Sequence, residues 1–337
     1  LSSPVVAGDR IFLTAADERS RKIFCFDTAD GRLLWTHELQ PMQGTPTESP
    51  QVSEDTGHAA SSPATDGARA FAIFANGDLA CVDRDGKKVW GVNLGVPDNP
   101  YGHASSLIVW RHLLIVQYDH HSEAFIAAFE TASGRVAWET KREVEASWTT
   151  PAIIDLPDRQ ILMTCSTPLL IAYDPATGKP LWSRDVLSGE LAPSPAFADG
   201  RVFVNDDGGR LFAFDPATGE PAWESDANTP DICSPVAFGK FIWLPNSAAT
   251  VVCCDTATGK QIAEIEFDEG FCASPIAAGG KIYTFDRNGS AFLFDAADPG
   301  AKPIRLELGE KVFATPAFVK DRLYIRAEKN LYCIGTK

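Results

Sequence analysis

The sequence has 337 residues, with 30 Lys and Arg against 45 Asp and Glu, so its formal net charge is −15. Apolar residues make up 45% and charged residues 22%, which is enough for a large core and excludes a globally disordered chain. This acidity argues against binding to nucleic acid or to an anionic membrane surface, and no apolar run approaches the ~20 residues of a membrane-spanning segment.

A phrase that begins with a small residue and ends in tryptophan recurs along the chain. In its first copy, Cys25 is followed by Asp27, Gly31 and Trp35. The acidic position recurs at residues 27, 83, 130, 174, 215, 255 and 295, so the spacing settles at 40. Most copies are preceded by Ser-Pro or Thr-Pro. The repeat predicts eight units, approximately over residues 1–40, 62–94, 104–141, 150–186, 194–226, 234–267, 274–308 and 315–337.

Within a unit the pattern predicts four short strands. Residues 195–225 show it most clearly, because four runs of apolar or β-branched residues are separated by the turns 199–200, 206–209 and 216–219. No stretch has a convincing helical period. Eight four-stranded antiparallel sheets at a repeat of about 40 residues predict an all-β, eight-bladed β-propeller, with residues 1–337 as a single domain.

The last unit, residues 315–337, has room for three strands only. Propellers usually close by borrowing a strand from the other terminus, which would need residues upstream of Leu1. The chain opens without an initiator Met or a leader, as expected for the processed part of a longer product. We therefore expect an eighth blade that is three-stranded here, or completed by residues outside this sequence.

The phrase A-x-D-x-x-T-G-x-x-x-W, complete at residues 172–182 and 213–223, resembles the tryptophan-docking repeat of the PQQ-like (pyrroloquinoline-quinone-type) propeller family. The resemblance covers essentially the whole chain. It implies an exported protein, periplasmic or otherwise extracytoplasmic. In compactness the chain is similar to the propeller lipoprotein of the outer-membrane β-barrel assembly machinery, and in its loops to uncharacterised bacterial PQQ-like repeat proteins. By resemblance, the residues that pack against the next blade are Trp35, Trp90, Trp138, Trp182 and Trp223.

The small residue of the motif is cysteine in several units. It is expected to lie buried beneath a tryptophan, as free cysteine often does. Ala263 takes the tryptophan position of unit six, and Asp298, Pro299 and Gly300 disrupt the turn of unit seven, so weaker blade junctions are expected at both units. The cysteines at the small-residue position are Cys25, Cys81, Cys253 and Cys333.

Quinoprotein alcohol dehydrogenases use the same propeller, with PQQ, calcium and a disulfide between adjacent cysteines. The pair Cys253-Cys254 therefore raises the alternative of a PQQ- and calcium-dependent oxidoreductase. Consecutive strand residues point to opposite faces, which favours two packed thiols. The family's calcium ligands lie on long insertions, and units five to eight have no room for them. We expect no cofactor, with PQQ and calcium as the alternative.

The length above 40 residues lies in the first four units, largely in the links 40–61, 95–105 and 141–149. In a propeller these links share one rim with the turns between second and third strands. Loops held by a rigid scaffold often carry function. We therefore expect a binding rim over blades two to four that contains His58, Tyr101, His103, Asp119, His120, His121 and Trp148.

The most direct prediction is a non-catalytic scaffold that binds a protein or glycan partner at this rim. His58 and His103, with Asp119 and either His120 or His121, could instead approach a divalent metal such as zinc, which leaves a metal-dependent enzyme as a further alternative. The same histidines could also bond backbone carbonyls and serve the fold alone. No nucleophile elbow, catalytic triad or phosphate-binding loop is present.

Overall fold

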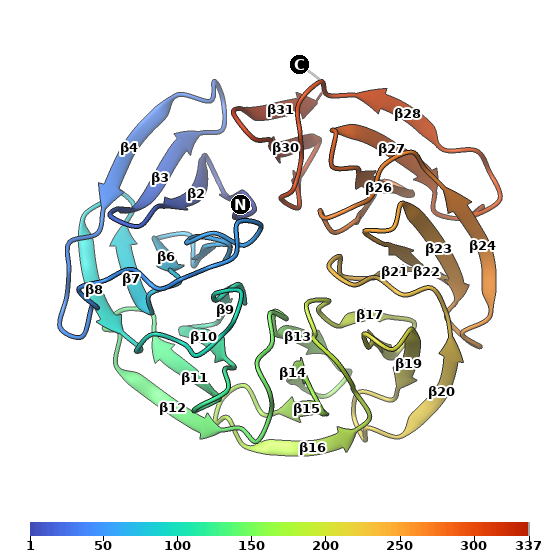
Figure 1. Ribbon diagram of the computed structural model, residues 1–337, viewed down its shortest axis with the longest axis horizontal. Helices are drawn as coiled ribbons and strands as arrows, with labels where there is room; N and C mark the ends of the chain where they lie inside the picture. Colours follow the sequence, from blue (N-terminus) through green and yellow to red (C-terminus); the bar gives the residue numbers. More distant parts are fainter. Residues whose placement is uncertain (336–337) are drawn as a thin grey trace. The chain divides into compact units, whose positions relative to one another are not determined.

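The computed structural model describes residues 1–335, and its regular structure is entirely β (Figure 1). The chain forms two compact units. The first comprises Leu1–Pro151 with Pro175–Lys179, and the second comprises Ala152–Asp174 with the described chain from Pro180 onward. Within the described residues, no helix has the length and apolar character needed to cross a membrane.

The first unit contains three four-stranded antiparallel sheets, each with its strands in chain order. These sheets are the first three blades. Their strands are β1 (Val5–Ala7), β2 (Arg10–Ala16), β3 (Arg21–Asp27), β4 (Leu33–Glu38), β5 (Ala64–Thr65), β6 (Arg69–Ile73), β7 (Asp78–Asp83), β8 (Lys88–Asn93), β9 (Ile108–Trp110), β10 (Leu113–Tyr118), β11 (Phe125–Glu130) and β12 (Val136–Lys141).

The second unit contains the strands of five further sheets, four of them four-stranded. Within residues 1–335 the last sheet has three strands, so the predicted eight-bladed propeller with an incomplete last blade is confirmed. The strands are β13 (Ala152–Asp155), β14 (Gln160–Ser166), β15 (Leu169–Tyr173), β16 (Pro180–Asp185), β17 (Ala196–Ala198), β18 (Arg201–Asn205), β19 (Arg210–Phe214), β20 (Pro221–Asp226), β21 (Val236–Phe238), β22 (Phe241–Pro245), β23 (Thr250–Asp255), β24 (Gln261–Glu266), β25 (Ile276–Ala278), β26 (Lys281–Phe285), β27 (Ser290–Asp295), β28 (Ile304–Glu307), β29 (Ala317–Val319), β30 (Arg322–Arg326) and β31 (Leu331–Gly335).

The core lies between neighbouring sheets, and each inner strand contributes to two layers of it. In β6, Phe71 and Ile73 pack toward the third blade, whereas Ala70 and Ala72 pack toward the first. This division follows from the period of two along a strand, which sends successive side chains to opposite faces. A blade buried on both faces therefore reads as a continuous apolar run rather than as an alternating one.

The tryptophan of an outer strand contacts the next blade, at the turn between that blade's third and fourth strands. Trp90 lies opposite Cys81 in its own sheet, its Nε1 donates to the Thr131 carbonyl at 2.9 Å, and its ring packs on Gly134. A buried indole N–H needs such an acceptor. The same bond recurs from Trp35 to Arg84, from Trp138 to Pro175, from Trp182 to Pro216 and from Trp223 to Thr256.

Replacing Gly134 with alanine should destabilise the protein more than the same change at Gly31. Both glycines occupy the same turn of the repeat with φ of +71°, which costs an L-residue roughly 1–2 kcal/mol. A Cβ at Gly31 meets nothing within 4 Å, whereas at Gly134 it would lie 2.6 Å from the Trp90 ring. We expect a loss of ~1 kcal/mol for Gly31→Ala and ~2–4 kcal/mol for Gly134→Ala in guanidinium unfolding. Equal losses would contradict the docking contact.

The expectation that the small residue is buried holds for three of the four cysteines and is wrong for Cys333. An outer-strand tryptophan lies opposite Cys25 and Cys81, whereas Ala263 lies opposite Cys253. Cys25, Cys81 and Cys253 are buried, and burial raises the pKa of the Cys81 thiol to about 12. Cys333 is exposed, since β31 is the outermost described strand of its three-stranded sheet and no tryptophan-bearing strand covers it.

Candidate functional site

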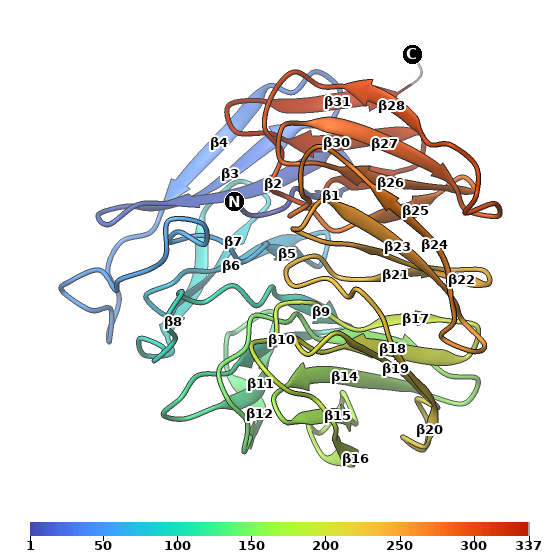
Figure 2. The same cartoon turned by 45° about the vertical axis from the view of Figure 1, so that its right-hand side comes forward.

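Three long links and one turn of the first unit form what we call the loop surface. The links are residues 39–63 between β4 and β5, residues 94–107 between β8 and β9, and residues 142–151 after β12. The turn is residues 119–124, between β10 and β11. Figure 2 shows the first link extending away from the strands that it connects.

The four segments are hydrogen-bonded to one another through the middle link, residues 94–107. The first link, the third link and the turn each donate one bond to a backbone carbonyl of that segment. These bonds run from Ser53 N to Tyr101 O at 3.2 Å, from Trp148 Nε1 to Gly102 O at 2.9 Å and from His121 N to Asp98 O at 3.0 Å. The loop surface is therefore an ordered structure built on three blades, not a set of independent loops.

A buried ion pair fastens the turn to the third link. Arg142 Nε lies 2.8 Å from Asp119 Oδ1, and both side chains have no exposed surface. Asp119 Oδ2 also accepts hydrogen bonds from Gln117 Nε2 at 2.7 Å and from Ser147 Oγ at 3.1 Å. Buried charges persist only when they are paired and hydrogen-bonded. Asp119 is thus engaged by groups of the protein itself.

His103 lies below the surface in a stack of rings. Its ring centroid is 4.9 Å from that of Tyr118, which lies 5.4 Å from that of His120. His103 is fully enclosed, and burial lowers the pKa of its imidazole to about 4, with a smaller contribution from His120. Burial likewise lowers the pKa of His120. Both imidazoles are therefore neutral at pH 7.

An aromatic pair lies at the outside of the same segments. Tyr101 is 41% exposed, and its ring centroid is 5.0 Å from that of Trp148, at an interplanar angle of 48°. The Trp148 indole is fixed by its bond to the Gly102 carbonyl. The structure thus brings together two aromatic residues that are 47 positions apart in sequence, 101 and 148.

His58 and His121 do not join the ring stack. His58 Nδ1 lies 3.4 Å from Ser49 Oγ, and this histidine lines a shallow hollow that Asp17 and Arg21 also border. His121 is exposed. Among residues 1–335, no three His, Cys, Asp or Glu side chains lie close enough to hold a metal ion. The structure thus divides the rim histidines and Asp119 among separate environments rather than into one ligand set.

Sequence reasoning missed Arg142 and the charge of the loop surface. The signal was readable, because Arg142 is the only Lys or Arg in these four segments. Since this cation is buried with Asp119, the exposed formal charges of the loop surface are all negative. They belong to Glu48, Glu54, Asp55, Asp98, Glu123, Glu143 and Glu145.

A family model described as outer membrane protein assembly factor BamB matches residues 1–116 and 122–237. The chain belongs to this PQQ-like propeller family. The matched residues include the three long links of the loop surface, whereas residues 117–121, which contain Asp119, His120 and His121, lie between the two matched ranges. No curated protein sequence matches this chain.

Solved structures with the same fold include members of two functional classes. BamB from Moraxella catarrhalis aligns with a TM-score of 0.75 and 16% identity, over 98% of this chain and 95% of that one. A europium-containing methanol dehydrogenase aligns with a TM-score of 0.68 and 12% identity, over 98% of this chain and 81% of that one. A quinohemoprotein alcohol dehydrogenase from Pseudomonas putida HK5 aligns with a TM-score of 0.69 and 12% identity, over 97% of this chain and 70% of that one. Likeness at this identity shows the fold alone.

The residues of this PQQ-like propeller do not fit a quinone centre at the adjacent cysteines. Cys253 and Cys254 are free and buried. Cys253 packs with Trp243 between the sixth and seventh blades, whereas Cys254 packs with Phe203 between the fifth and sixth. The two thiols thus face opposite sides of β23.

Proposed function

We propose that this member of the PQQ-like propeller family is a non-catalytic binding scaffold, acting outside the cytoplasm, that holds a polypeptide partner on the loop surface of its first unit. The observation that carries the proposal is the Tyr101–Trp148 pair. Tyr101 presents an exposed ring on a support that the Trp148–Gly102 bond fixes in advance. Rigid aromatic residues of this kind are frequent anchors in protein interfaces because little side-chain entropy remains to be lost.

Two further observations support a scaffold. The long links are hydrogen-bonded to each other, so their shape is set before a partner arrives. The chain matches a family model named for an assembly factor, which favours a protein partner outside the cytoplasm. The acidic side chains of the loop surface are exposed and do not converge on a nucleophile or a metal within the described chain.

Site-specific photo-crosslinking in the cells that make the protein tests this proposal. A benzophenone amino acid is placed at residue 101 or, as a control, at residue 238. Tyr101 and Phe238 are matched in exposure, at 41% and 42%, and Phe238 lies in β21 of the second unit. We expect one discrete polypeptide adduct at residue 101 that is absent at residue 238. A glycan adduct, no adduct, or the same adducts at both positions would contradict the proposal.

A further inference from the structure

The loop surface carries negative charge that nothing nearby neutralises. Its seven exposed carboxylates form no ion pair with any other described residue, and its one cation, Arg142, is enclosed with Asp119. Like charges gathered over a few loops repel one another and raise the local negative potential. The surface is therefore set up to attract a cation from outside the chain.

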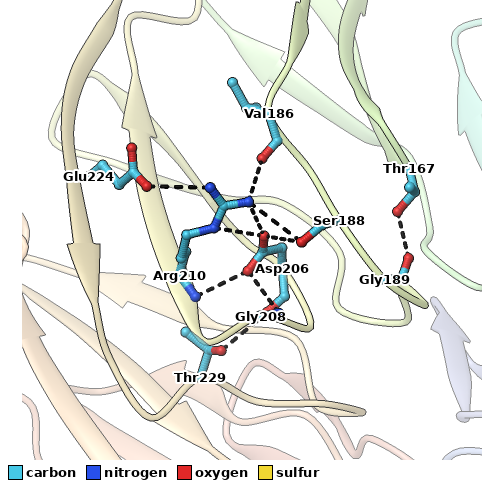
Figure 3. A network of polar contacts seen from close by, with 9 residues as sticks. All are labelled: Thr167, Val186, Ser188, Gly189, Asp206, Gly208, Arg210, Glu224 and Thr229. Carbon is cyan, nitrogen blue, oxygen red and sulfur yellow. Dashed lines mark hydrogen bonds and ion pairs between the residues drawn. The ribbon is translucent and has the colours of Figure 1, made fainter.

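The second unit shows that the fold does not require this arrangement. In the turn after β18, Asp206 Oδ2 lies 2.6 Å from Arg210 Nη2 and accepts a hydrogen bond from Ser188 Oγ at 2.7 Å (Figure 3). The same arginine, 37% exposed, reaches Glu224 at 3.5 Å. Asp206 in that unit thus has an accessible cation of its own. The absence of an accessible cation from the loop surface is therefore a property of the loops in the first unit and not a requirement of the fold.

Two of these carboxylates are close in sequence to the aromatic pair. Asp98 is three residues before Tyr101, and Glu145 is three residues before Trp148. Tyrosine and tryptophan rings attract Lys and Arg side chains through their quadrupoles, and arginine also stacks on them. An exposed tyrosine ring and a half-buried tryptophan ring, on segments that also carry acidic side chains, thus supply both features that recognise a cationic side chain.

The middle link also contains polar atoms without partners. Asn99 Nδ2, His103 Nε2 and Ser105 Oγ make no hydrogen bond with the described residues. The three side chains are 8%, 2% and 2% exposed. Buried polar atoms are rarely left unpaired, so three of them in one segment need an explanation such as an ordered water or a ligand. This observation is independent of charge and marks the same segment.

We infer that the loop surface binds a cationic stretch of polypeptide, with one Lys or Arg side chain against Tyr101 and Trp148 and others close to the exposed carboxylates. The inference rests on the proposed function and names the chemistry of its partner. Nucleic acid would be repelled by this surface. A bare metal ion needs convergent ligands, which the described residues do not bring together.

Fluorescence anisotropy with the full chain tests the inference. The probe is a fluorescein-labelled octapeptide in which four arginines alternate with glycine and serine, compared with its four-glutamate counterpart at 20 and 200 mM NaCl. We expect the arginine peptide to bind, with an affinity that falls as salt rises, and the glutamate peptide not to bind. Glu143→Lys/Glu145→Lys should weaken binding about tenfold or more, and Tyr101→Ala about fivefold.

The control is Glu139→Lys/Asp158→Lys, which changes the net charge by the same amount at exposed positions outside the loop surface. It should weaken binding less than about twofold, because distant exposed charges are screened. Equal weakening by the two double variants would overturn the inference, and so would no binding of the arginine peptide. If crosslinking at residue 101 still yields a polypeptide adduct in that case, the scaffold proposal stands and only the cationic partner is excluded.

Discussion

Replacing Arg142 with methionine is expected to destabilise the protein by about 3–5 kcal/mol. The change removes the partner that lies 2.8 Å from Asp119 and leaves a carboxylate with no exposed surface. Hydrogen bonds from Gln117 and Ser147 compensate only part of the lost ion pair. Guanidinium unfolding followed by tryptophan fluorescence measures the loss.

The matched control is Arg135→Met, since Arg135 immediately precedes β12 and Arg142 immediately follows it. Arg135 Nη2 lies 2.9 Å from Glu130 Oε2, yet the arginine is 77% exposed. Exposed pairs contribute little because water solvates both charges, so the loss at Arg135 should be much smaller. Asp119→Leu/Arg142→Met, which removes both charges, should regain part of what Arg142→Met loses. If the two single methionine variants lose equal stability, burial does not govern the Asp119 pair.

The propeller could be predicted from the sequence because each blade repeats one contact. A tryptophan such as Trp90 packs on a glycine such as Gly134 in the next blade, so the two residues recur once in each blade. The length of this repeat along the chain then gives the number of blades. The prediction was wrong at Cys333 for a related reason. A motif position indicates burial only when an outer strand covers it, and β31 is the outermost described strand of its sheet.

The sequence was enough to predict which segments form the candidate site, but not which of their side chains contact one another. Links longer than the repeat requires were enough to locate Tyr101 and Trp148. The pairing of Asp119 with Arg142 was not predictable, because it depends on how the turn and the third link pack at 23 residues' separation. The depth of His103 depends in the same way on its stacking against Tyr118. A histidine in a loop reads as exposed until the packing partner is known.

Lowering the pH from 6.5 to 4 is expected to remove about 3 kcal/mol of stability through His103. Its pKa is about 4 in the folded protein, against an ordinary value of 6.5, because burial disfavours the imidazolium. The unfolded chain therefore takes up the proton first as the pH falls. This contribution is complete above pH 6.5 and is lost progressively toward pH 4. Guanidinium unfolding at half-unit steps of pH measures the slope.

His103→Gln isolates this effect from the titration of the carboxylates, because glutamine keeps a polar side chain that takes up no proton in this range. The difference in stability between the natural chain and His103→Gln should shrink as the pH falls from 6.5 to 4. The same substitution at exposed His112 serves as the control, and its difference from the natural chain should change less. A constant difference for His103→Gln would mean that the buried imidazole does not resist protonation. Since His103 lies in the middle link, which bonds to the other three segments, its protonation should loosen the loop surface before the rest of the first unit.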